Sequence, residues 1–247
     1  MPTGTSSNKK YTYVWVSTIV LIFGVFAVYE ITKRLKEGTV VENDRLGGTV
    51  KLSSLSYIVS NGEKRRVPEF TFLNQDSTVV SNKDYLGKVY VVDFFFTTCP
   101  TICPVMTNNL VELQNTFSDE RELGFASFTI NPRYDTPSIL KKYADKHGVD
   151  NEDWNLMTGD REQIYTLAQE GFYILANEDA TAPGGFEHSG MFALVDKEGY
   201  IRSRMDKYGN PIIYYRGTVT EEQGVNEEGE VQHITMLKED IKKLLEE

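Results

Sequence analysis

The chain has 247 residues, with 36 acidic side chains against 26 lysines and arginines, so its formal net charge is −10. That balance argues against nucleic-acid binding, because a phosphate-binding surface needs a basic patch and no lysine- or arginine-rich stretch is present. The composition is that of an ordinary globular protein, which argues against disorder and against repeats.

The first predicted element is an apolar segment near the N-terminus. The run from Tyr13 to Tyr29 is uncharged and mostly Val, Ile, Leu and Phe, with positive charges on both flanks. It is near the ~17-residue minimum for a spanning helix, and aromatic residues lie near both of its ends. A cleaved signal peptide is the alternative, but no small-residue cleavage pattern follows Val28. We predict a short tail over residues 1–12 and a transmembrane anchor over residues 13–31, which exports the rest.

Residues 32–66 follow as a predicted tether, rich in Gly, Ser and charged side chains. From Val67 to the end, the pattern predicts alternating strands and helices. Strands are expected at 70–73, 79–81, 89–96, 123–130, 154–157, 191–196 and 200–205, and helices at 103–117, 136–147, 160–170 and 234–245. This order indicates an α/β domain, and a thioredoxin-like fold, a central mixed β-sheet flanked by helices, fits it.

The chain has only two cysteines, Cys99 and Cys103, where the apolar strand at 89–96 gives way to the helix at 103–117. The positive end of a helix favours thiolate over thiol. An offset of four residues places both sulfurs on one side of a turn. The pair therefore fits a shared metal ion or a reducible disulfide, and a purely structural disulfide is the third interpretation.

Of three histidines, His147 and His233 lie at the predicted ends of helices and are interpreted as surface residues. His188 lies in a glycine-rich segment, 184–190, that we expect to be a flexible loop directly before the strand at 191–196. In a thioredoxin-like sheet the loop entering that strand lies beside the cysteine loop. Two thiolates and one imidazole make a three-coordinate site suited to Cu(I), and they also hold Cu(II).

With these residues in place, the chain resembles the SCO/SenC family of membrane-anchored, thioredoxin-like copper proteins. Four motifs carry the resemblance: Thr-Cys-Pro-Thr-Ile-Cys-Pro at 98–104, Asn-Pro-Arg-Tyr-Asp-Thr-Pro at 131–137, Leu-Met-Thr-Gly-Asp at 156–160, and His188-Ser189. The resemblance covers about residues 67–195. The resemblance implies that Cys99, Cys103 and His188 are copper ligands. It also implies a role in building the dinuclear CuA centre of cytochrome c oxidase.

The chain departs from the family pattern at three positions near the expected site. The family usually has Asp where Thr101, Asn131 and Glu187 stand here. Thr101 and Asn131 leave less negative charge near the thiols. The stretch 208–232 is longer than the usual connection before the last helix, and its paired glutamates predict an acidic surface insertion.

Two functions compete, and a peroxidase is a weaker third, because a Cys-x-x-x-Cys pair with this histidine is not the usual equipment of related folds that reduce peroxides. The first is a metallochaperone that passes copper from its two cysteines and His188 to the CuA subunit of cytochrome c oxidase. The second is a thiol–disulfide oxidoreductase in which Cys99 attacks a target disulfide and Cys103 resolves the product. The spacing, wider than Cys-x-x-Cys, and the histidine loop favour copper. We expect a copper donor as partner, and also a thiol reductase, because exported thiols are otherwise oxidised.

The expected location is the bacterial inner membrane, with a single-pass anchor and the domain on the periplasmic side. No arginine occurs in the first twelve residues, so a mitochondrial presequence is not indicated.

Three further kinds of residue near the expected site need an interpretation. Met106 and Met191 are assigned to core packing rather than to copper. Asp135 is interpreted as a helix cap, and a hydrogen bond near the site is the alternative. Asp93 interrupts an apolar strand, where a carboxylate needs a partner that the sequence does not name.

Overall fold

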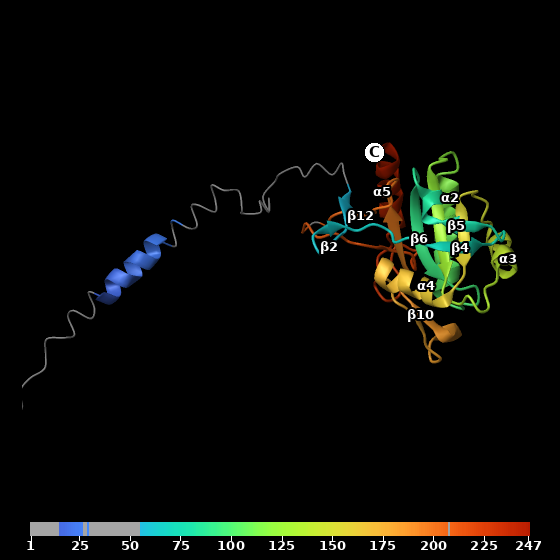
Figure 1. The fold of residues 1–247 in the computed structure, drawn as a ribbon, viewed down its shortest axis with the longest axis horizontal. Coiled ribbons are helices and arrows are strands. Elements are labelled where there is room, and N and C mark those ends of the chain that lie inside the picture. Colours follow the sequence, from blue (N-terminus) through green and yellow to red (C-terminus); the bar gives the residue numbers. More distant parts are fainter. Residues whose placement is uncertain (1–14, 27–28, 30–54, 207) are drawn as a thin grey trace, which may run out of the picture. The chain divides into compact units, whose positions relative to one another are not determined.

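The computed structural model describes residues 15–26, 29, 55–206 and 208–247 (Figure 1). The chain divides into two units, residues 1–50 and 51–247. In the first unit, residues 15–26 are helical with exposed side chains. Within the described residues no helix combines the length and the apolar character that a membrane crossing requires. Both ends of the predicted anchor, the tail at 1–12 and most of the predicted tether lie outside the described residues.

The second unit is built on a mixed sheet, as the strand pattern predicts. Its strands run in the order β1-β12-β11-β6-β7-β8-β4-β5, and β13 also pairs with β11. The bounds are β1 Ser56–Tyr57, β4 Thr71–Asn74, β5 Val79–Ser81, β6 Val89–Phe95, β7 Leu123–Thr129, β8 Trp154–Thr158, β11 Met191–Val195, β12 Ile201–Ser203 and β13 Tyr215–Arg216. The three central strands β6, β7 and β8 are parallel, and every residue of β6 and β7 is buried. Continuous apolar strands are expected where both faces of a sheet are covered.

The helices lie close to their predicted positions. They are α2 Ile102–Thr116, α3 Pro137–His147, α4 Arg161–Thr166 and α5 Ile234–Glu246, with a π-helix η2 at Leu167–Gly171 and 3₁₀ turns η1 Asn82–Tyr85 and η3 Pro183–Gly185. Pro137 at the first turn starts α3, and Gly148, in the left-handed conformation at φ 75°, ends it. In the view of Figure 1, α5 and α3 lie on opposite sides of β6.

Two predictions about the ends of elements need correction. His188 does not lie in a flexible loop, because it is the last residue of β10 (Phe186–His188), which pairs with β9 (Ala176–Glu178) in a separate hairpin. The predicted tether also contributes to the fold from residue 55 onward. There β1 pairs with β12, and β2 (Val59–Ser60) pairs with β3 (Glu63–Lys64). Leu55 and Ile58 are buried, so the folded unit starts before Val67.

Candidate metal centre

The two cysteines lie at the carboxyl end of β6, where the chain turns into α2. Cys99 follows a turn in which its backbone N–H donates to the carbonyl of Phe96 at 3.2 Å. Cys103 lies in the first turn of α2, and its backbone N–H donates to the Cys99 sulfur at 3.5 Å. Free N–H groups at a helix start need acceptors, and a sulfur that accepts such a bond is stabilised as thiolate. Local chain geometry thus directs both sulfurs to one point.

Asp135 fixes the cysteine loop and does not cap α3, so the capping interpretation was wrong. The cap position belongs to Thr136. The fully buried Asp135 carboxylate accepts hydrogen bonds from the Thr97 backbone at 3.1 Å, from the Thr97 hydroxyl, and from the Thr129 hydroxyl at 2.5 Å. A buried carboxylate needs several donors, and the adjacent ends of β6 and β7 supply them. Asp135 therefore holds the turn that leads to Cys99.

His188 completes the cluster from a distant part of the chain. Its Nε2 lies 3.2 Å from the Cys103 sulfur, and one donor atom from each of Cys99, Cys103 and His188 lies within 4.8 Å of the others. Exposure is 8% for Cys99, 1% for Cys103 and 8% for His188, so the cluster is shielded from water. The Nδ1 atom of His188 is buried and has no hydrogen-bond partner among the described residues.

The hydrogen bonds give the two thiols opposite character. Donation from Cys103, with further hydrogen bonding from His188, lowers the pKa of Cys99 to about 3. Burial raises the pKa of Cys103 far above its ordinary value, and the neighbouring Cys99 sulfur raises it further. The free pair is therefore one thiolate and one thiol that share a proton, with the thiolate at the more exposed position.

Asp93 has a partner that the sequence could not name. Ser127 donates its hydroxyl to the Asp93 carboxylate at 2.5 Å, and the Trp154 indole donates to the same hydroxyl at 3.0 Å. Burial raises the pKa of Asp93 to about 7, against the lowering effect of the Ser127 hydrogen bond. A negative charge on Asp93 in turn raises the pKa of Cys103. A second titratable group is thus coupled to the cysteine site.

The donors fit a soft metal ion. For metal–sulfur bonds of about 2.3 Å, two donors of one ion are at most roughly 4.6 Å apart. The three donor atoms lie within 4.8 Å of one another, so only a small movement is needed for all three to bind one ion. Two thiolates and an imidazole suit Cu(I) and also accept Cu(II). Cys99, Cys103 and His188 therefore fit copper.

Comparison with known proteins decides the family. A protein-family model described as SCO1/SenC matches residues 59–220. The SCO1 protein homolog of Bacillus subtilis (strain 168) is 34% identical over 140 residues, which cover 55% of this chain and 70% of that protein. The chain belongs to the SCO1/SenC family.

Solved SCO1/SenC structures share the fold. A SCO1/SenC family lipoprotein from Bacillus anthracis (strain Ames) is 30% identical with a TM-score of 0.60, over 73% of this chain and 95% of that one. BsSco, a member of the Sco family of cytochrome c oxidase assembly proteins in which a disulfide switch was identified, is 27% identical with a TM-score of 0.58, over 73% and 94%. The predicted thioredoxin-like α/β fold is confirmed.

The three departures from the SCO1/SenC pattern lie at different distances from the thiols. The Thr101 hydroxyl is 3.7 Å from the Cys99 sulfur, so a neutral group stands directly beside the thiolate. Asn131 is half-buried, and its backbone N–H donates to the Thr129 hydroxyl at 3.0 Å. Glu187 is exposed beside His188 in β10. Thr101 is therefore the departure that bears directly on the site.

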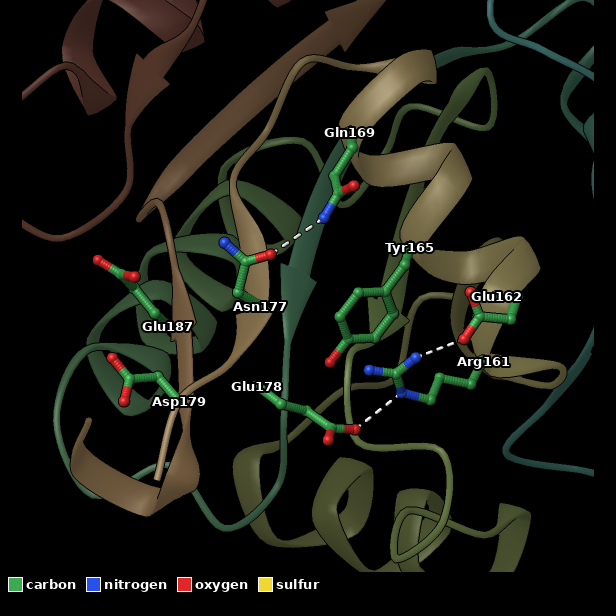
Figure 2. Close-up of a pocket in the computed structure, with 8 residues that line it drawn as sticks. All are labelled: Arg161, Glu162, Tyr165, Gln169, Asn177, Glu178, Asp179 and Glu187. Atoms are coloured by element: carbon green, nitrogen blue, oxygen red, sulfur yellow. Dashed lines mark hydrogen bonds and ion pairs between the residues drawn. The ribbon is translucent and has the colours of Figure 1, made fainter. Parts of the chain in front are cut away.

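A pocket of about 550 Å³ lies beside the SCO1/SenC site without containing it (Figure 2). It is lined by Arg161, Glu162, Tyr165, Gln169, Asn177, Glu178, Asp179 and Glu187. The Arg161 guanidinium pairs with Glu178 at 2.7 Å and with Glu162 at 2.5 Å. None of the three donors lines this pocket, which accords with a buried three-donor site that needs no large cavity.

The remaining predicted residues take structural roles in this SCO1/SenC domain. Met106 is fully buried in the core. The His147 ring packs on Tyr143 with centroids 4.3 Å apart, and His233 accepts a hydrogen bond from the Arg216 backbone at 3.2 Å. The structure describes all three histidines, and among them only His188 joins the cysteines.

Proposed function

We propose that the chain is a membrane-anchored copper chaperone that holds one copper ion through Cys99, Cys103 and His188. The observation that carries this proposal is the convergence of two sulfurs and one imidazole nitrogen within 4.8 Å in a buried position. Its client is the CuA site of cytochrome c oxidase, which the chain supplies with copper or prepares for it. Membership of the family that includes BsSco, a Sco protein of cytochrome c oxidase assembly, supports that client.

The location follows from the same proposal. The apolar run at 13–29 anchors the chain in a bacterial inner membrane, and the folded unit works on the periplasmic side. A related family member from Bacillus anthracis is a lipoprotein, which supports a membrane-attached domain. The copper donor and a thiol reductase act on the chain from that side.

The protonation of the site sets how copper is taken up. Cys99 is already a thiolate, whereas Cys103 must lose its proton before it can bind, because metals take the deprotonated sulfur. Copper therefore competes with a proton at Cys103, and affinity falls as the pH falls. Cys99 is the more exposed sulfur, so a target ligand reaches it first during transfer.

A second function, thiol–disulfide exchange, is favoured by the same thiolate–thiol pair. Cys99 attacks a target disulfide, which forms a mixed disulfide and releases one target thiolate. Cys103 then gives its proton to the departing target sulfur and attacks the Cys99 sulfur, which releases the second target thiol and leaves a Cys99–Cys103 disulfide. The target gains two electrons and the chain loses two, so a reductase must restore the pair. Such a step also prepares the target cysteines for copper.

Cu(I) titration of the reduced, full-length chain under anaerobic conditions tests the proposal. We expect one tightly bound copper per chain, with weaker binding in Cys99→Ser, Cys103→Ser and His188→Ala. His147→Ala is the matched control, because it removes an imidazole that packs on Tyr143 and does not belong to the three-donor cluster. Specific binding that His188→Ala leaves unchanged would contradict the three-donor site, and no specific binding at all would favour the thiol–disulfide function.

A further inference from the structure

Part of the predicted acidic insertion is buried. Residues 215–221, called the strap below, begin with β13, and Tyr215, Gly217 and Val219 are buried within it. Tyr215 donates its hydroxyl to Asp240 of α5 at 2.8 Å, and Asp240 is itself fully buried. The strap is therefore an ordered part of the fold, fixed to the last helix.

One side of the strap touches the chain directly after His188. Residues Met191 and Arg216 are paired between β11 and β13, and the Gly217 N–H donates to the Gly190 carbonyl at 2.8 Å. A Cβ atom on Gly190 would lie 2.0 Å from the Thr218 methyl group. Because no real Cβ tolerates that distance, any larger residue at position 190 would force the Thr218 side chain to move.

The other side of the strap touches the helix that carries Cys103. Asn109 of α2 is 1% exposed, and its side-chain amide donates to the carbonyls of Gly217 at 2.8 Å and of Val219 at 3.2 Å. Lys238 of α5 pairs with both Glu112 of α2 and Glu221 of the strap. The strap thus connects the histidine segment to the cysteine helix.

The histidine hairpin is also tied at another place. Gln169 of η2 donates to the Asn177 side chain of β9 at 3.1 Å and to the Ala176 carbonyl at 2.8 Å. Figure 2 shows the first of these contacts. The pairing of β9 with β10 transmits this attachment to His188. The hairpin is thus held to η2, and the strap adds the attachment to α2.

We propose that the strap is a positioning element of the metal site, and that Asn109 is its main positioning residue. It sets the separation of His188 from the two cysteines by tying Gly190 to α2. This inference rests on the proposed copper function. Residues that orient metal ligands typically change metal affinity by 10- to 100-fold when they are removed.

The test compares Asn109→Ala with Gln114→Ala in the full-length chain. Gln114 is the matched control, because it is also a buried amide of α2 that binds backbone groups, at Gly148, Asp150 and Asn151. We expect Asn109→Ala to weaken Cu(I) binding about tenfold in competition with a chromophoric chelator. We also expect it to change the electron paramagnetic resonance spectrum of the Cu(II) form. Gln114→Ala should leave both unchanged; equal effects of the two variants would overturn the proposal.

A rescue pair tests the contact itself. Gly190→Ala should change the same spectrum by pushing against Thr218. Adding Thr218→Ser removes the methyl group and should restore the wild-type spectrum, because the next strap atom lies 3.4 Å from the new Cβ. Failure of rescue would show that Gly190 acts through something other than the strap.

A measurement without metal separates the two proposals. The ring resonances of His188 in the metal-free chain should shift in Asn109→Ala and stay in place in Gln114→Ala. If the wild-type chain binds no copper, the chaperone proposal fails, while these resonances still decide whether the strap positions His188. Unshifted resonances in Asn109→Ala would overturn the strap proposal even if copper binds.

Discussion

Asp93 makes the stability of the domain depend on pH in a direction opposite to that of most carboxylates. Burial raises its pKa from 3.8 to about 7 in the folded chain. A raised folded pKa means that the contribution of this group to stability is full below pH 4 and is lost as the pH rises to 7. The difference of about 3 pKa units corresponds to roughly 4 kcal/mol. Asp93→Asn removes this dependence.

The assay is urea unfolding of wild type and Asp93→Asn between pH 4 and pH 9. The asparagine oxygen can still accept from Ser127, and its unpaired amide adds a constant cost of about 1–3 kcal/mol. Between pH 4 and pH 7 the free energy of unfolding of the variant should therefore rise by up to about 4 kcal/mol relative to that of wild type. Above pH 7 the difference between the two proteins should stay constant. Asp145→Asn, on the surface of α3, controls for the loss of one charge. Parallel stability curves for wild type and Asp93→Asn would refute the reasoning.

Three further predictions concern the thiols and the buried ionic groups. At pH 5, iodoacetamide should modify Cys99 well before Cys103, because the pKa of Cys99 is lowered to about 3 while Cys103 stays a buried thiol; peptide mass spectrometry that finds both labelled equally would contradict the proton arrangement. Arg202→Met should lower the free energy of unfolding by roughly 3–5 kcal/mol in urea, because it leaves the buried Asp196 carboxylate without its 2.9 Å partner; an unchanged midpoint would count against this. Asp135→Ala should cost roughly 2–4 kcal/mol through unpaired donors at the cysteine turn, and a calorimetric melting temperature equal to that of wild type would exclude it.

Much of the site could be predicted because it depends on short-range pattern and on sheet topology. The apolar run that becomes β6 and the helix pattern after Cys103 place both sulfurs at a strand end. Residues of β11 pair with β6, Ala193 with Val92, so the segment entering β11 arrives beside the cysteine turn. The position of His188 could therefore be predicted before any contact was known.

What the sequence did not reveal depends on contacts between distant segments. The strands β9 and β10 have only three residues each, too few for an alternating pattern to register. Asp135 precedes a helix, so the sequence favours a local cap. In the fold its carboxylate instead accepts hydrogen bonds from Thr97 and Thr129, at the ends of β6 and β7. Val219 is a single buried apolar residue between two threonines, just before Glu221, so composition indicated an exposed loop where the chain packs.

Copper binding and thiol–disulfide exchange cannot take place at the same site at the same time. A Cys99–Cys103 disulfide removes two of the three donors in the cluster, so an oxidised chain cannot hold copper in the proposed way. Reduction restores one thiolate and one thiol, and copper binding then releases the Cys103 proton. The redox state of the pair thus decides whether the site is ready for metal. A chain that first reduces a target disulfide must itself be reduced before it can load copper.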